Sequence, residues 1–182
     1  MKKFLSWLFI IQSLSLLTVG AYMVYLHETP SLLSFNNYQY SKKIASDSIK
    51  GEIPQRITIA SQGIDLPIYP ATIKNNIWPT TDLAASYLTS SPLPGENGNS
   101  VIYAHNWTSL FGKLRSAKVG DKVVVTYPDK TKKTFVIEYT SIVSPNESTI
   151  LAPSNDKRIT LYTCTGWFDS ERFVAVAILQ KS

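Results

Sequence analysis

The chain has 182 residues, of which 44% are hydrophobic and 17% are charged, so it can fold into one domain with some extra chain and is too apolar for wholesale disorder. Its net charge is +5, and Lys2 and Lys3 supply two of these charges. The remaining positive excess is too small for a nucleic-acid-binding surface, so we expect no nucleic-acid partner.

The first predicted element is an apolar helix over residues 4–26. These positions carry no charge, and about 20 apolar residues are enough to cross a bilayer. Lys2 and Lys3 precede the segment, whereas no Lys or Arg follows it before Lys42. Because cytoplasmic flanks carry the excess of Lys and Arg, residues 1–3 are expected in the cytoplasm and the rest of the chain outside the cell.

A cleaved signal peptide is the alternative interpretation of this segment. Val19 and Ala21 are small residues that could precede a cleavage site. The apolar run nevertheless continues past them and exceeds the core of roughly 7–15 residues that signal peptides have. We therefore expect an uncleaved signal-anchor and a single-pass protein of the cell membrane.

Residues 27–52 contain several Ser and Asn residues and no sustained periodicity, which predicts an extracellular stalk or linker. Residues 53–182 are rich in short runs of Val, Ile, Thr and Tyr separated by turn residues, and many short strands predict an all-β barrel or sandwich. Residues 82–88 and 109–114 predict short helices or turns. We expect strands over residues 56–61, 99–105, 122–127, 133–139, 158–164 and 172–179.

Cys164 is the only cysteine of the chain, so it forms no internal disulfide. It is an inert buried thiol, a metal ligand or a nucleophile. One Cys and two His cannot build a Cys-rich zinc site, which weakens the metal interpretation. Strand alternation puts Ile159 and Leu161 on the core face and Cys164 on the opposite, more polar face, at the end of the strand. Because strand ends that open into loops often carry chemistry, this position favours a nucleophile.

A thiol nucleophile needs a proton partner, and acyl transfer creates an oxyanion that needs a donor. His105 ends a predicted strand and is the one histidine away from the apolar N-terminal segment. A lone histidine can also be an ordinary surface or core residue. Arg172 begins the last predicted strand, on the face of Val174 and Val176. It is either an arginine at the rim of the domain or the oxyanion donor.

The sequence Thr-Leu-Tyr-Thr-Cys at residues 160–164, followed by Arg172 in Arg-Phe-Val, resembles the signature of the sortase family. Residues 98–106, with the Leu-Phe-Gly-Lys-Leu and Val-Gly-Asp-Lys-Val runs that follow, are similar to the histidine segment of that family. One departure is Ala104, where the family usually has glycine before the histidine. The order of His, Cys and Arg also matches, and the resemblance covers about residues 60–180.

The resemblance implies a closed barrel of about eight strands, tethered to a membrane, that cleaves an LPxTG-like sorting signal of surface proteins. It implies that Cys164 attacks the substrate carbonyl and forms a thioacyl intermediate, which an amine such as a peptidoglycan cross-bridge or a pilin lysine then resolves. His105 would transfer protons, and Arg172 would bind substrate carbonyls and the oxyanion. Thr163 and Thr165 are assigned to oxyanion or substrate binding.

No nucleotide, metal or organic cofactor is expected, because the thioester conserves the bond energy. Calcium dependence occurs in parts of the family, but Glu138, Glu147 and Asp156 show no convincing ligand spacing. One alternative is another cysteine acyltransferase of the cell wall, such as an L,D-transpeptidase, whose nucleophile motif resembles Ser-x-Gly-Cys and not the Tyr-Thr-Cys-Thr found here. The other is a non-catalytic, membrane-tethered β-domain that binds a wall component or a protein partner.

Overall fold

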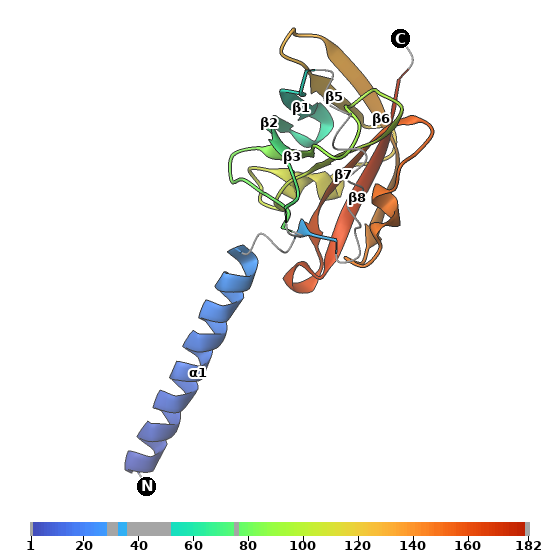
Figure 1. The fold of residues 1–182 in the computed structure, drawn as a ribbon. Coiled ribbons are helices and arrows are strands. Elements are labelled where there is room, and N and C mark those ends of the chain that lie inside the picture. The colour runs from blue at the N-terminus through green and yellow to red at the C-terminus, as the bar shows by residue number, and fades with distance from the viewer. Residues whose placement is uncertain (1, 29–32, 36–51, 75–76, 181–182) are drawn as a thin grey trace.

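The computed structural model describes residues 2–28, 33–35, 52–74 and 77–180, and it consists of a long helix followed by a closed β-barrel (Figure 1). Within the described residues, eight strands follow one another around the barrel in the order β1-β2-β3-β4-β7-β8-β6-β5, and β5 pairs back with β1. The predicted all-β barrel with one preceding helix is confirmed. The strands are β1 Arg56–Ile59, β2 Ile64–Ala71, β3 Ala85–Leu88, β4 Gly98–Tyr103, β5 Lys122–Thr126, β6 Lys132–Val143, β7 Lys157–Thr165 and β8 Glu171–Leu179.

Short 3₁₀ helices connect some of these strands. They are η2 Ala60–Gln62, η3 Phe111–Ser116, η4 Ser148–Leu151 and η5 Trp167–Asp169. The element η3 agrees with the helix or turn predicted over residues 109–114, and it follows the histidine segment. The element η5 lies between β7 and β8.

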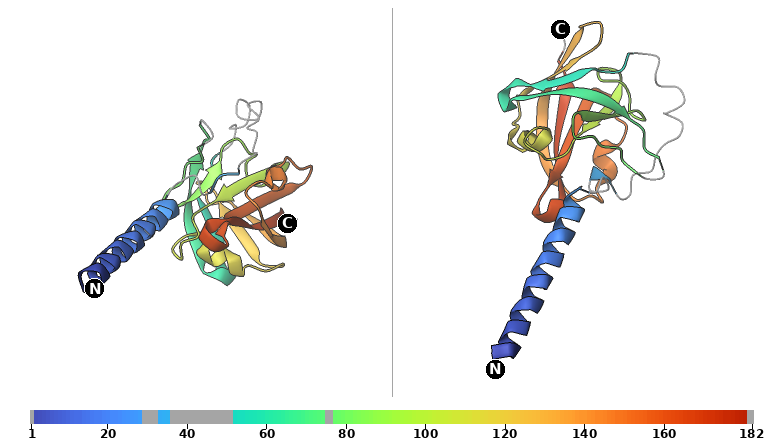
Figure 2. Two further views of the ribbon diagram at one scale, coloured as in Figure 1. Left: turned by 90° about the horizontal axis from the view of Figure 1, so that it is seen from below. Right: turned by 90° about the vertical axis from the view of Figure 1, so that its left-hand side faces the viewer.

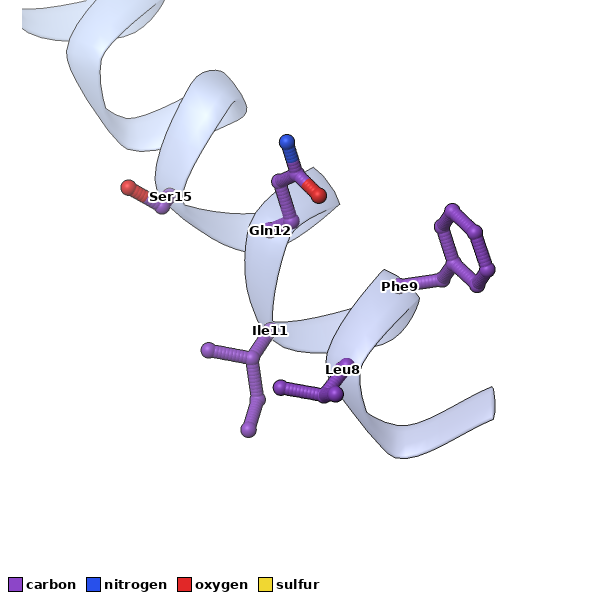
Figure 3. Close-up of a pocket in the computed structure, with 5 residues that line it drawn as sticks. All are labelled: Leu8, Phe9, Ile11, Gln12 and Ser15. Carbon is purple, nitrogen blue, oxygen red and sulfur yellow. The ribbon is translucent and has the colours of Figure 1, made fainter. Parts of the chain in front are cut away.

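Helix α1 spans Lys2–Glu28 and extends away from the barrel in every view (Figures 1 and 2). Its segment Ser6–Tyr25 is long and apolar enough to cross a membrane, and none of it is buried. A hollow on this helix is lined by residues of α1 alone, so it belongs to the open outer surface of the helix and is not an enclosed ligand site (Figure 3). The lining residues are Leu8, Phe9, Ile11, Gln12 and Ser15.

Strand alternation builds two separate apolar clusters. The interior core fills the barrel and takes side chains from all eight strands, including Ile57, Phe135 and Leu161. The outer core lies on the other face of β4, β7 and β8 and includes Tyr103 and Tyr162. Both faces of these three strands are buried over most of their length, and β8 is accordingly a nearly continuous apolar run from Phe173 to Leu179.

Two strands differ from the sequence prediction. Residues 82–88 were predicted as a helix or turn, but Ala85–Leu88 form β3, and all four residues are buried. Burial on both faces removes the polar alternation that would have identified a strand. The prediction omitted β2, whose two prolines argue against a strand interior. In the structure, Ile64–Pro67 pair with β1 and Ile68–Ala71 pair with β3, so each half has a partner on one side only.

The predicted stalk over residues 27–52 falls mostly outside the described residues, and it stays a prediction. Of this segment the structure describes the end of α1, residues 33–35 and Glu52. Leu33 and Phe35 are fully buried in the outer core. A part of the chain that directly follows the apolar helix therefore packs against the barrel.

Candidate active site

The three predicted catalytic residues lie at one end of the barrel. Strands β4 and β7 are parallel neighbours in which Tyr103 faces Tyr162, and His105 and Cys164 each come two residues after this pair. Parallel strands reach the same edge of a sheet together. Cys164 and Arg172 are direct partners in the antiparallel pair β7–β8, and such partners have Cβ atoms about 4.5–5.5 Å apart. The topology thus brings thiol, imidazole and guanidinium to one place.

Cys164 is 3% exposed and belongs to the outer core. The alternation was predicted correctly, since Ile159 and Leu161 lie in the interior core on the other face. Cys164 was predicted on the more polar face, at an open strand end, but that face is buried as well, because side chains from distant segments cover it. Burial raises the pKa of the Cys164 thiol to about 12, while Arg172 lowers it by a smaller amount. The thiol is therefore protonated at neutral pH in this state.

Residues Leu33–Phe35, which we call the 33–35 segment, cover this end of the outer core. The Tyr162 hydroxyl donates a hydrogen bond to the carbonyl oxygen of Leu33 at 3.0 Å. Nη2 of Arg172 donates to the carbonyl oxygen of Ser34, also at 3.0 Å. The Phe35 ring meets the Tyr162 ring edge-on, with centroids 5.1 Å apart, and lies 5.9 Å from Cζ of Arg172. The segment thus holds groups that flank Cys164.

Arg172 is only 3% exposed, although it carries a charge. Its Nη1 donates to the carbonyl oxygens of Asp169 and Glu171 at 2.9 Å, in addition to the bond from Nη2 to Ser34. Its Nε is buried and has no hydrogen-bond partner within the part of the chain that the structure describes. All three acceptors are backbone carbonyl oxygens, which are the groups that a peptide substrate presents. The guanidinium therefore binds groups of the kind that a peptide substrate presents, and its Nε is a further donor without a partner among the described residues.

His105 follows β4 in a loop over residues 104–110, which we call the histidine loop and which packs against η3. His105 is 9% exposed. Its ring stacks on the ring of Trp107, with the centroids 4.7 Å apart and the planes inclined by 12°. Phe111 N–H donates to the His105 carbonyl oxygen at 3.0 Å, and Gly112 N–H donates to that of Trp107 at 2.9 Å. A Cβ at Gly112 would lie 2.4 Å from the Asn106 carbonyl oxygen. The glycine is thus required for η3 to approach the histidine loop this closely.

The loop that follows Cys164 forms a hydrogen bond with the histidine loop. Nδ2 of Asn106 donates to Oδ1 of Asp169 at 2.6 Å. Sequence reasoning identified no residue that could fix the position of the histidine loop, and it missed Asp169. The only sequence signal was the position of this carboxylate between Cys164 and Arg172.

The two threonines assigned to the oxyanion lie on either side of Cys164 in β7. Thr163 is fully buried, and its hydroxyl donates to the carbonyl oxygen of Ala104 at 2.8 Å. This bond links β7 to the residue before the histidine, so in this structure the hydroxyl joins the two strands that carry the site. Thr165 is buried at the last position of β7, opposite Glu171. Their role in oxyanion or substrate binding stays a prediction.

No group of three or more His, Cys, Asp and Glu residues among the described positions is placed to hold a metal ion. Asp156 forms an ion pair with Arg158, and Glu147 accepts a hydrogen bond from Thr149. A hollow lined in part by Glu96 and Lys133 lies beside residues that precede β4 and open β6, away from Cys164.

Comparisons with known proteins agree with this fold and this arrangement. Residues 57–180 match the family model of the sortase domain, and the chain therefore belongs to the sortase family. Sortase A of Listeria monocytogenes is 28% identical over 144 residues, which are 77% of this chain and 62% of that protein. The chain thus spans less than two thirds of the length of this curated relative.

Solved structures of the same family share the barrel. The crystal structure of Listeria monocytogenes sortase A is 27% identical, with a TM-score of 0.57 over 72% of this chain and 89% of that one. Sortase C from Clostridium perfringens SM101 is 23% identical, with a TM-score of 0.61 over 88% of each chain. At 23% identity, the similarity to the Clostridium perfringens structure establishes the fold alone.

Proposed function

We propose that this chain is a cysteine transpeptidase that cleaves an LPxTG-like sorting signal and transfers the surface protein to an amine, such as a peptidoglycan cross-bridge or a pilin lysine. Membership of the sortase family supports this activity. The observation that carries the proposal is the guanidinium of Arg172, which faces Cys164 across β7 and β8 and already binds three backbone carbonyl oxygens. A peptide bond presented to Cys164 would meet donors of the same kind.

In the first step, the Cys164 thiol gives its proton to His105, and Sγ attacks the carbonyl carbon of the threonine in the signal. The C–S bond forms, the C–N bond breaks, and His105 gives its proton to the departing amine. Arg172 stabilises the negative charge on the carbonyl oxygen as it develops. In the second step, an incoming amine attacks the thioester, the new C–N bond forms and the C–S bond breaks, and His105 takes the proton of that amine and returns it to Sγ of Cys164. Atoms and protons balance without a cofactor.

Substrate binding requires the 33–35 segment to leave the site, because the Ser34 carbonyl occupies Nη2 of Arg172 and Phe35 packs beside it. Once the segment leaves, water and substrate reach Cys164. Since burial is the main cause of the raised thiol pKa, this exposure would lower it. The covered structure thus represents a resting state of the proposed enzyme.

We further propose that α1 anchors the enzyme, with residues 1–3 in the cytoplasm and the barrel outside the cell. The length and composition of Ser6–Tyr25 support the anchor, and Lys2 and Lys3 support the orientation. Protease added to intact cells with permeabilised walls should digest the barrel. Full protection of the barrel under these conditions would contradict the orientation.

The burial of Cys164 is the one observation that favours the alternative of a non-catalytic binding domain. The test is to incubate the full chain in detergent micelles with a mixture of LPxTG-type peptides and to analyse the intact protein by mass spectrometry. The wild type, or a Phe35→Ala variant with a weakened cover, should carry an acyl fragment that Cys164→Ala lacks. No acyl fragment on either protein, with folding confirmed by circular dichroism, would favour the binding domain.

A further inference from the structure

Two large aromatic side chains project into solvent between Cys164 and Arg172. Trp167 is 81% exposed and Phe168 is 51% exposed, and their rings pack edge-on with centroids 5.1 Å apart. By contrast, Trp78 is fully buried in the outer core of the same protein. Adjacent exposed aromatic residues mark an interaction surface more often than single exposed ones do. We call Trp167 and Phe168 the aromatic tip.

The backbone holds the aromatic tip outward. Gly166 has φ of 79°, and the non-glycine residues Phe168 and Asp169 have φ of 52° and 57°, in the left-handed region that such residues rarely adopt. The loop is fixed just beyond the tip, where Asp169 accepts a hydrogen bond from Asn106 and from Arg172. A strained loop persists only when its surroundings determine it. The backbone conformation of the loop therefore keeps both aromatic rings exposed.

The aromatic tip lies beside the end of α1. The element η5, which contains both aromatic residues, contacts α1, and Figures 1 and 2 show that this is the end of α1 nearest the barrel. The apolar segment ends at Tyr25, and the helix continues for only three residues to Glu28, which is a rise of about 4.5 Å. The tip therefore lies close to the level at which the apolar segment ends.

Tyr22 and Tyr25 are exposed on this last turn of the apolar segment. Trp and Tyr concentrate where a membrane-crossing helix passes through the lipid headgroups, because their rings are amphipathic. The aromatic tip adds an indole and a phenyl ring at that depth from a different part of the chain. Asp169 and the exposed Glu171 flank it, so its contribution to membrane binding would be apolar and not an attraction to anionic lipid.

We propose that the aromatic tip inserts into the headgroup region of the bilayer that α1 crosses. This inference rests on the proposed membrane anchor. The insertion would fix the barrel end that carries Cys164, His105 and Arg172 against the membrane surface. The site would then favour a substrate whose cleaved bond lies close to the membrane over one that extends far from it.

The test uses the fluorescence of Trp167 in the full chain. Trp7 lies in α1 and is replaced by phenylalanine, so that Trp78, Trp107 and Trp167 remain. The protein is inserted into phosphatidylcholine vesicles with or without bromine on the acyl chains near the headgroup, since bromine quenches tryptophan at short range. The quenched fraction should be lost in a Trp167→Phe variant. It should remain in the matched control Trp107→Phe, which removes a tryptophan of the histidine loop.

Flotation of each protein with the vesicles reports on the anchor separately. If the protein floats and Trp167→Phe is quenched as strongly as its parent, the aromatic tip does not touch lipid and this inference is wrong while the anchor stands. If the protein does not float, both the anchor and the tip insertion are wrong. Neither readout depends on catalysis, so transpeptidase activity is tested independently.

Discussion

The interior core and the outer core are both buried, but they are closed in different ways. The interior core is closed by the barrel, because every strand contributes side chains such as Ile57 and Phe135. The outer core is closed by residues distant in sequence, among them Phe35 and Trp78. Opening the interior would require strands to separate, whereas movement of the 33–35 segment would uncover part of the outer core without separating strands. Chemistry that needs access can therefore be located in the second and not in the first.

The largest expected effect tests whether the outer core contains the nucleophile. Cys164→Ala should reduce peptide cleavage to below about 1% of wild type, because no other thiol is present to form the acyl intermediate. The free energy of unfolding should change little, since the substitution removes one sulfur atom. Chromatography of cleaved peptide and circular dichroism measure the two effects. Residual cleavage above this level would show that the reaction does not require the thiol.

The sequence was sufficient to predict most of the barrel and to select Cys164, His105 and Arg172, which the structure places at one end of it. Short β-branched runs identified six strands, and the local order of residues around Cys164 and Arg172 suggested the family. Alternation also placed Cys164 correctly on the face opposite Ile159. These features depend on residues that are neighbours along one strand, and a pattern of period two records them directly.

The cover of the site could not be predicted in this way. Phe35 and Trp78 join the cluster that contains Cys164 only through tertiary packing, and no local pattern connects positions so far apart in the chain. The face of Cys164 was therefore interpreted as polar, although it is buried. Asp169 was missed for a related reason, because its bond to Asn106 joins two loops that follow different strands.

The second prediction tests the proton partner. His105→Ala should reduce kcat by roughly 10²–10⁴-fold, which is the range for removing a positioned acid or base. Trp107→Phe is the matched control, because it keeps a ring to stack on His105 and should retain most of the activity. A loss of less than tenfold in His105→Ala would place the proton transfer elsewhere.

The third prediction concerns the charge that is buried beside the outer core. Arg172→Lys should reduce kcat by roughly 10²–10³-fold, because lysine lacks the planar set of donors that binds several carbonyl oxygens at once. Arg172→Ala should be at least as inactive. KM should change less than kcat if the contact forms mainly in the transition state. Activity of the lysine variant within about threefold of wild type would mean that positive charge alone is sufficient.

The fourth prediction removes a phenyl ring from the interior core. Phe135 is fully buried there, and Phe135→Ala should lower the free energy of unfolding by about 3–5 kcal/mol. Urea denaturation measures this loss. The pKa of the Cys164 thiol should stay near that of the wild type, because the barrel wall still separates the two cores. A large decrease in this pKa would show that the two cores are not independent.

The fifth prediction makes the same substitution in the outer core. Phe35→Ala removes the ring that packs on Tyr162 and near Arg172. Its effect on unfolding should be smaller than that of Phe135→Ala, because the 33–35 segment can detach without separating strands. The pKa of the Cys164 thiol should fall from about 12 towards its ordinary value of 9.0, since burial is the largest cause of the increase.

The direction of this shift can be measured in two ways. The rate of alkylation by iodoacetamide follows the thiolate, so its midpoint should move to lower pH in Phe35→Ala and stay in place in Phe135→Ala. Stability follows the same group. Because the pKa of this thiol is raised in the folded state, its contribution to the free energy of unfolding of the wild type is fully present below pH 9.0. This contribution is lost as the pH rises from 9.0 to about 12. Phe35→Ala should lose less stability across that interval, and an unchanged alkylation midpoint would show that the 33–35 segment does not control access to Cys164.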